Sequence, residues 1–279
     1  MIVVTGASGQ LGRLVIEGLR TRGAEVVAGA RNPAAAADLG VEVRELDYDR
    51  PETLAPALEG AERVLLVSGS EPGKRVPQHL AVIDAASQAG VKHLVYTSAP
   101  NADTTALVLA PEHKATEAAI RLAGLPYTFL RNGWYHENYL DAIARAAETG
   151  ELVGAAGEGR VASAARADFA DAAVAVLTGA AHENRIYELS GDVAWSFPEL
   201  AAAIAEVAGR PVAYRDLPPA EFEKFLVSTG LPAEAAGFVV ALEQNIADGT
   251  LAGTSGELTA LIGRPTTPIT DTIKAVLAR

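Results

Sequence analysis

The sequence has no cysteine and no histidine pair with the spacing of a metal site. The absence of cysteine among its 279 residues excludes disulfide bonds, a thiolate nucleophile and cysteine-ligated zinc. The five histidines are scattered and form neither an H-E-x-x-H nor an H-x-H pattern. We therefore expect a protein without a bound metal.

An excess of positive charge and long apolar runs are also missing. The formal net charge of −12 argues against general binding to nucleic acid or to an anionic membrane surface. No uninterrupted apolar run reaches the roughly 18 residues that a membrane span requires. A strand-like segment begins at residue 2, where a secretory signal would carry basic residues followed by an apolar stretch. We expect a cytoplasmic protein, monomeric or homodimeric, with no nucleic-acid or membrane partner.

The strongest motif is a glycine-rich turn near the start of the chain. Apolar and β-branched residues at 2–5 predict a buried strand, and Gly6, Gly9 and Gly12 follow at spacing G-x-x-G-x-x-G. Apolar residues then recur at helical spacing. Such a strand, turn and helix bring backbone N–H groups and a helix N-terminus to a pyrophosphate. The alternative is a turn of this shape that binds no nucleotide. The residues expected to contact a dinucleotide here are Gly6, Ser8, Gly9, Gln10, Leu11 and Gly12.

The second strand, at 25–30, ends without the acidic residue that would hold the ribose 2′-hydroxyl of NAD. Arg31 stands there instead, and an arginine can grip a 2′-phosphate with two parallel hydrogen bonds. We therefore predict NADPH as the cofactor, with NADH as the alternative. If Arg31 were only a solvated arginine at a strand end, this preference would have no basis.

The rest of the first half alternates strands with helices. Strands are expected at 41–46, 63–68, 92–97 and 126–131, with helices between them. This pattern predicts an α/β fold, a Rossmann-type doubly wound parallel sheet of strand order 3-2-1-4-5-6. Asp47 follows the third strand, where it could meet an adenine amine; the alternative is that Asp49 or Asp47 caps a helix. Further cofactor contacts are expected from Ser68, Gly69, Ser70, Arg75 and Ser98.

Beyond the sixth strand the pattern changes. Half of the residues at 134–139 are aromatic, against 5% of the whole chain. Ligands in open parallel sheets bind outside the carboxyl ends of the strands, which is where this segment lies. It either binds an acceptor or anchors a second domain. A strand at 185–189 and several helices follow, so we expect a dinucleotide-binding domain at 1–150 and a smaller, mainly helical lobe at 151–279, with some exchange of chain between them.

Several segments together resemble one family. TGASGQLG at 5–12, ARNP at 30–33, EHKATE at 112–117, LRNGWYHENY at 130–139 and GRPTTP at 263–268 are similar to the NmrA-like atypical short-chain dehydrogenases/reductases. Within that family the chain most resembles the bacterial type-2 NAD(P)H:quinone oxidoreductases. Triphenylmethane dye reductases share this branch, as do redox-sensing regulators that bind the dinucleotide without turnover.

The resemblance implies an NADPH-dependent reductase that transfers hydride to a quinone or a similar conjugated aromatic, including a polycyclic natural-product quinone. The alternative is a redox-sensing regulator. The Tyr-x-x-x-Lys pair of standard short-chain reductases is missing, because no tyrosine has a lysine four residues later. A quinone does not need that acid, since solvent can protonate the hydroquinone anion.

The expected acceptor site follows from the same segment. Its residues are Asn132, Trp134, Tyr135 and Asn138. The catalytic candidate is His113, which would hydrogen-bond the nicotinamide ribose or assist protonation. His113 is alternatively a surface residue paired with Glu117 one turn later, and Lys114 competes with it for the same role.

Overall fold

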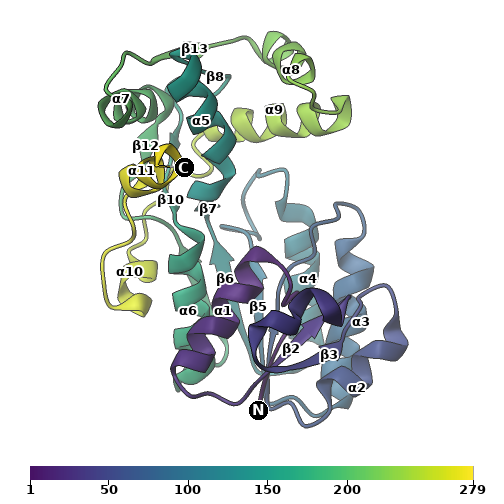
Figure 1. Ribbon diagram of the computed structural model, residues 1–279. Helices are drawn as coiled ribbons and strands as arrows, with labels where there is room; N and C mark the ends of the chain where they lie inside the picture. Colours follow the sequence, from purple (N-terminus) through teal and green to yellow (C-terminus); the bar gives the residue numbers. More distant parts are fainter. Residues whose placement is uncertain (279) are drawn as a thin grey trace.

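A seven-stranded parallel sheet forms the centre of the computed structural model, which describes residues 1–278 (Figure 1). The strand order is β11-β6-β5-β4-β1-β2-β3, which confirms the predicted order 3-2-1-4-5-6 and adds one strand beside the sixth. The strands are β1 (Ile2–Val4), β2 (Val26–Ala30), β3 (Glu42–Glu45), β4 (Arg63–Leu66), β5 (His93–Ser98), β6 (Tyr127–Asn132) and β11 (Arg185–Leu189).

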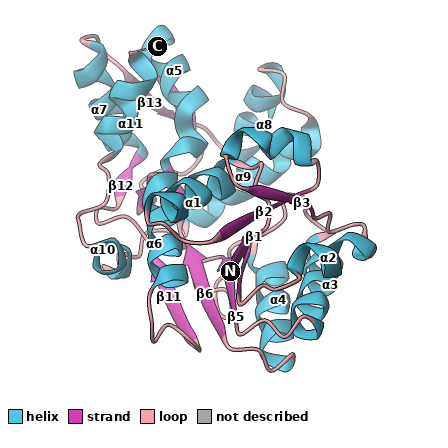
Figure 2. Ribbon diagram, turned by 60° about the horizontal axis from the view of Figure 1, so that its bottom comes forward, coloured by secondary structure: helices cyan, strands magenta, loops and turns pink. Residues whose placement is uncertain are grey.

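Helices cover both faces of this sheet (Figures 1 and 2). One layer holds α1 (Gln10–Thr21), α6 (Arg166–Thr178) and α10 (Glu257–Ile262); the other holds α2 (Leu54–Leu58), α3 (Arg75–Gln88) and α4 (Ala110–Leu122). Successive strand residues point to opposite faces, so Val4 packs into the core under α1 and α6, and Val3 into the core under the other layer. The predicted doubly wound α/β fold is confirmed.

A smaller lobe stands above the carboxyl ends of the strands (Figure 1). Its core gathers aromatic side chains, among them Tyr139, Trp195 and Phe197. Its helices are α5 (Leu140–Thr149), α7 (Phe197–Ala208), α8 (Pro219–Ser228), α9 (Ala233–Ala247) and α11 (Ile269–Leu277). Three short strand pairs complete it: β7 (Trp134–Tyr135) with β10 (Ser163–Ala164), β9 (Arg160–Val161) with β12 (Trp195–Ser196), and β8 (Glu151–Gly154) with β13 (Ala213–Asp216). A short 3-10 helix, η3 (His136–Tyr139), also packs in this lobe, whereas η1 (Pro33–Leu39) and η2 (Pro51–Thr53) pack beside the large sheet.

The chain passes between the two parts more than once. After residue 150 it returns to the large sheet through α6, which packs on α1, and through β11, which pairs with β6 over Arg185–Leu189. The division at residue 150 stays a prediction. No helix among residues 1–278 is long and apolar enough to cross a membrane.

Candidate dinucleotide and acceptor site

The turn after β1 has the geometry that its glycines predict. Gly6 adopts φ +59°, a conformation that L side chains rarely adopt. A Cβ on Gly12 would lie 2.4 Å from the carbonyl oxygen of Gly6, so only glycine allows α1 to begin this close to the strand. The backbone N–H groups of Gln10, Leu11 and Gly12 find no main-chain acceptor within residues 1–278. These free donors and the positive end of the helix dipole fit an anionic phosphate group.

A groove of about 320 Å³ opens directly beside this turn. It lies at the carboxyl ends of β1, β2, β3 and β4, where open α/β sheets bind ligands. Eight of the predicted cofactor residues line it: Gly6, Ser8, Gly9, Arg31, Asp47, Ser68, Gly69 and Ser70. Sequence reasoning missed the other six residues that line it, which are Leu46, Tyr48, Asp49, Val67, Glu71 and Gln78.

Arg31 reaches the groove from the end of β2. Its side chain is 71% exposed, and its guanidinium lies 3.7 Å from the Glu71 carboxylate, which also pairs with Lys74 at 2.8 Å. An exposed ion pair of this kind contributes little to stability. The guanidinium is therefore free to exchange Glu71 for a phosphate.

The polar side chains of the loop after β3 form hydrogen bonds within the protein. The Asp47 carboxylate accepts a hydrogen bond from the Asp49 amide at 3.1 Å, and the cap position of η2 is Arg50. Of the two roles expected for Asp47, the structure therefore does not give it the cap. The Tyr48 hydroxyl donates to the Val67 carbonyl at 2.8 Å and meets Thr5, which ties this loop to β1 and β4.

Arg75 supports the loop after β4. Its Nε donates to the Gly69 carbonyl at 2.6 Å, and its Nη1 pairs with Glu112 at 3.1 Å. The Gly69 amide donates to His79 at 3.0 Å, and burial with the nearby Arg75 charge lowers the pKa of His79 to about 4. Arg75 thus holds Gly69 in place and does not line the groove. No local pattern in the sequence signalled the contribution of His79.

Ser98 joins a buried ionic network at the ends of β5, β6 and β11. Its hydroxyl donates to Glu117 at 2.7 Å, and Glu117 receives two hydrogen bonds from Arg131, at 2.9 and 2.7 Å. Arg131 also contacts Glu188 at 2.8 Å and Asp103 at 2.9 Å. Ser98 therefore already has a protein partner, and its expected cofactor contact stays a prediction.

His113 is buried and lies against Tyr96. Its Nδ1 and the Tyr96 hydroxyl are 2.8 Å apart, while Glu117, its expected partner, pairs with Arg131. Burial, and then the charges of Arg75 and His79, lower the pKa of His113 to about 3. The imidazole is therefore neutral near pH 7. Of the two expected roles, hydrogen bonding to a ribose suits a neutral ring, and proton donation does not. Lys114, the competing candidate, donates to the Asp103 carbonyl at 3.1 Å.

The four expected acceptor residues divide into two pairs. Trp134 and Tyr135 form β7, and neighbouring strand residues face opposite sides. Tyr135 packs edge-on against Phe169 and accepts from Asn132 at 3.2 Å. Trp134 and Asn138 line a cavity of about 680 Å³ between α5, α8 and α9. Sequence reasoning grouped all four residues because it did not predict the short strand.

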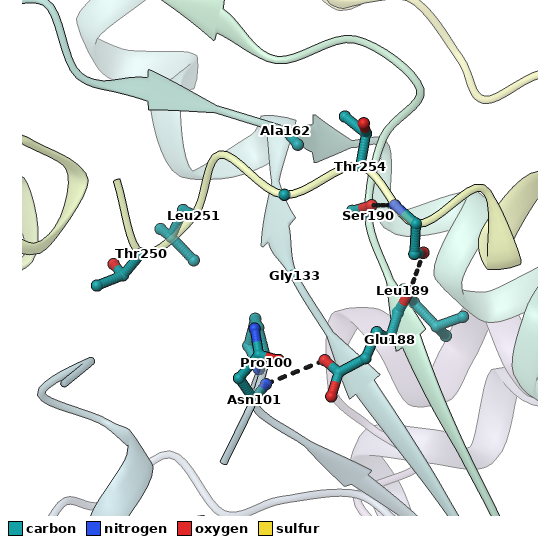
Figure 3. Close-up of a pocket in the computed structure, with 12 residues that line it drawn as sticks. Pro100, Asn101, Gly133, Ala162, Glu188, Leu189, Ser190, Thr250, Leu251 and Thr254 are labelled. Carbon is teal, nitrogen blue, oxygen red and sulfur yellow. Dashed lines mark hydrogen bonds between the residues drawn. The ribbon is translucent and has the colours of Figure 1, made fainter. Parts of the chain in front are cut away.

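A further pocket, of about 260 Å³, lies at the carboxyl ends of β5, β6 and β11 (Figure 3). Pro100, Asn101, Gly133 and Glu188 line it from the sheet, and the loop at 250–255 closes it from the other side. The Asn101 amide donates to the Glu188 carboxylate at 3.0 Å across one wall. This pocket continues the same sheet edge that carries the groove.

Comparisons with known proteins agree with this arrangement. A family model described as NAD(P)H-binding matches residues 6–180. Quinone oxidoreductase 2 of Escherichia coli is 46% identical over 98% of this chain and 97% of its own length. A crystal structure of the NADPH-dependent quinone oxidoreductase from that organism, complexed with NADPH, superposes with a TM-score of 0.96 at 45% identity, covering 99% of this chain and all of that one.

A second solved structure supports the same assignment. The Citrobacter sp. triphenylmethane reductase complexed with NADP(H) gives a TM-score of 0.95 at 39% identity, covering 99% of this chain and all of that one. The glycine turn, the groove beside it and these full-length matches lead to one conclusion: the chain belongs to the NAD(P)H-binding NmrA-like reductases.

Proposed function

We propose that this protein is an NADPH-dependent reductase that transfers hydride to quinones, in the cytoplasm, as a monomer or homodimer. The observation that carries the proposal is the similarity, over nearly the whole chain, to E. coli quinone oxidoreductase 2, with the phosphate-binding turn and the segment at 134–139 both formed. The finer proposal is that polycyclic quinones are included, because the cavity beside Trp134 has a volume of about 680 Å³.

Different residues of the groove would hold different parts of the cofactor. The N-terminus of α1 would hold the pyrophosphate, Arg31 the 2′-phosphate, and Ser68, Gly69 and Ser70 the part of the cofactor that continues along the sheet edge. NADPH supplies a hydride when it is bound. The acceptor has to lie in a near-attack geometry, which a rigid aromatic wall can maintain. The reduced quinone leaves as an anion that water can protonate, so the reaction needs no Tyr-Lys pair.

An acceptor panel tests this function. We expect the purified protein to oxidise NADPH only when a benzoquinone, naphthoquinone or anthraquinone is added, with the naphthoquinone and anthraquinone turned over at least as well as the benzoquinone. If NADPH binds and no quinone is reduced, the protein is a redox-sensing regulator instead. If only benzoquinone is reduced, the preference for polycyclic acceptors is wrong.

The 2′-phosphate contact gives a prediction at Arg31. Removing one charge-assisted hydrogen-bonding group costs roughly 1.5–3 kcal/mol, or about tenfold to a hundredfold in affinity. Because Arg31 is largely exposed, we expect Arg31→Ala to weaken NADPH binding by about tenfold and to leave NADH binding nearly unchanged. Calorimetric titration of both cofactors measures this difference. Equal NADH and NADPH affinity in the unmodified protein would show that Arg31 does not contact the phosphate.

The absence of a tyrosine acid gives a prediction at Tyr96. Its ring is fully buried and its hydroxyl contacts His113, and burial raises the pKa of that hydroxyl well above its usual range. We therefore expect Tyr96→Phe to retain kcat within about threefold, whereas loss of a true general acid costs about 100-fold or more. Steady-state kinetics with a naphthoquinone measures the difference. A 100-fold loss in a folded variant would assign Tyr96 a catalytic role.

A further inference from the structure

One carboxylate lies between two cations at the rim of the groove beside the glycine turn. The Oε1 atom of Glu71 lies 3.7 Å from Nη1 of Arg31, and its Oε2 atom lies 2.8 Å from Nζ of Lys74. Arg31 directly follows β2 and Lys74 directly precedes α3, so the two cations come from separate parts of the chain. Arg31 and Glu71 both line the groove, and Lys74 reaches it through its contact with Glu71. Two positive charges therefore surround a single anionic group at this rim.

The loop that carries Glu71 and Lys74 is fixed at both ends. The carbonyl and the amide of Gly69 both form hydrogen bonds with side chains from α3, and the Gly73 amide donates to the Glu112 carboxylate at 3.0 Å. Between these anchors, the Lys74 amide donates to the Glu71 carbonyl at 3.2 Å and closes a turn. The Glu71 side chain can therefore rotate, while its backbone stays beside the groove.

The Lys74 side chain is exposed and close to the groove. Within residues 1–278, Glu71 is the only carboxylate within 4 Å of its amine, and the side chain is 62% exposed. Glu71, and then the more distant charge of Asp49 on the groove wall, raise the pKa of Lys74, while the charge of Arg31 opposes this rise. The amine is therefore near enough to act on an anion bound at Arg31.

A 2′-phosphate held by Arg31 cannot share that place with the Glu71 carboxylate. Both groups are anions that only accept hydrogen bonds near pH 7, so they repel each other at short distance. A phosphate has more charge and more acceptor oxygens than a carboxylate, so it can bridge the same two cations. The exchange costs little, because exposed ion pairs such as those of Glu71 contribute little to stability.

We propose that Lys74 is a second cation for the 2′-phosphate of NADPH, and that Glu71 occupies the place of this phosphate in the cofactor-free protein. When NADPH binds, its phosphate replaces the carboxylate between Arg31 and Lys74, and the carboxylate turns to solvent. The proposal rests on the contact between Arg31 and the phosphate given under the proposed function. It assigns the two residues opposite effects, because Lys74 favours NADPH and Glu71 opposes it.

Calorimetric titration with adenosine 2′,5′-bisphosphate and with AMP isolates the 2′-phosphate. The two probes differ only in that group, and neither requires a nicotinamide or quinone turnover. In Lys74→Gln we expect the affinity for the bisphosphate to fall about three- to tenfold and the affinity for AMP to stay within about twofold. Lys74→Arg keeps the charge and should bind the bisphosphate within about twofold of the unmodified protein. Unchanged bisphosphate affinity in Lys74→Gln would overturn the role of Lys74.

Glu71→Gln is expected to have the opposite effect. The amide keeps the size of the side chain and removes its charge, so the bisphosphate should bind about three- to tenfold more tightly and AMP within about twofold. Unchanged or weaker bisphosphate binding would show that Glu71 does not compete with the phosphate, and would overturn the proposal. Both effects should shrink at about 1 M salt, where the Debye length is about 3 Å, as a purely structural effect would not.

Lys92→Gln and Glu62→Gln are the matched controls. These residues also form an exposed ion pair, and they lie directly before β5 and β4, at the edge of the sheet opposite the groove. Neither change should alter the affinity for the bisphosphate by more than about twofold.

The outcomes distinguish this proposal from the contact on which it rests. If the unmodified protein binds the bisphosphate no more tightly than AMP, the phosphate contact of Arg31 is wrong and the role of Lys74 is wrong with it. If the bisphosphate binds more tightly than AMP but the Lys74 and Glu71 variants behave like the unmodified protein, only the present proposal is overturned. The Arg31 contact and the quinone reductase function then remain.

Discussion

Gly9→Val is expected to abolish NADPH binding while the protein stays folded. Gly9 is the residue before α1, with φ −78° and ψ 166°, an extended conformation that valine adopts readily. A Cβ there would contact only the Gly6 carbonyl oxygen, at 3.1 Å. The isopropyl group would, however, stand in the groove beside the free N–H groups. Losing two or more hydrogen bonds to a charged phosphate weakens binding by about 100-fold or more.

Calorimetry with NADPH and thermal unfolding together check this expectation. Gly237→Val is the matched control, because a Cβ at Gly237 on α9 meets nothing closer than 3.8 Å and this helix is remote from the groove. It should bind NADPH normally. Undiminished binding by a folded Gly9→Val protein would show that the phosphate is not held at this turn. Unfolding would show that Gly9 is required for the fold.

Glu117→Ala is expected to cause the largest loss of stability. Glu117 and Arg131 are 1% and 4% exposed and form a two-point ion pair, to which Ser98 adds a hydrogen bond. Removing one partner of a buried pair costs roughly 3–5 kcal/mol, because the remaining charge stays buried. Glu188 and Asp103 still contact Arg131, so we expect the lower value of about 3 kcal/mol and a Tm lower by roughly 6–12 °C.

Thermal and urea unfolding measure this effect. Glu206→Ala, on the exposed surface of α7, should change stability by no more than about 0.5 kcal/mol. If Glu117→Ala cost less than about 1 kcal/mol, Glu188 and Asp103 would be sufficient to neutralise Arg131, and the network would not depend on the buried pair.

The parts of the fold that depend on local pattern could be predicted from the sequence. Buried strands that alternate with amphipathic helices indicated the sheet and its order. The spacing of Gly6, Gly9 and Gly12 indicated the turn. The structure explains Gly6 by its positive φ, and Gly12 by the 2.4 Å that would separate a Cβ there from the Gly6 carbonyl oxygen. The position of β11 could not be predicted, because its place beside β6 depends on a return of the chain across more than 50 residues.

The residues of the candidate site could be predicted only where they directly follow a strand of the sheet. Arg31, Asp47 and Ser68 line the groove because strands β2, β3 and β4 end there. Arg75 and Ser98 instead bond to Glu112 and Glu117, partners that lie 37 and 19 residues away in sequence. The hydrophobic periodicity of a sequence does not reveal hydrogen bonds between side chains this far apart.

The cavity between α5, α8 and α9 shows the same limit. Its walls on α8 and α9 and the burial of Glu243 arise when these helices pack against the segment that follows β6. That packing brings together residues about 100 positions apart, so a sequence pattern could indicate only the aromatic cluster at 134–139.

Anaerobic single-turnover reduction tests directly whether the protein transfers hydride from NADPH to a quinone. The protein is saturated with a known amount of NADPH and mixed with a small excess of 2-methyl-1,4-naphthoquinone, and NADPH absorbance and hydroquinone formation are followed together. We expect both to change at one rate and in equal molar amounts. NADPH that remains bound and unoxidised in the presence of the quinone would contradict it.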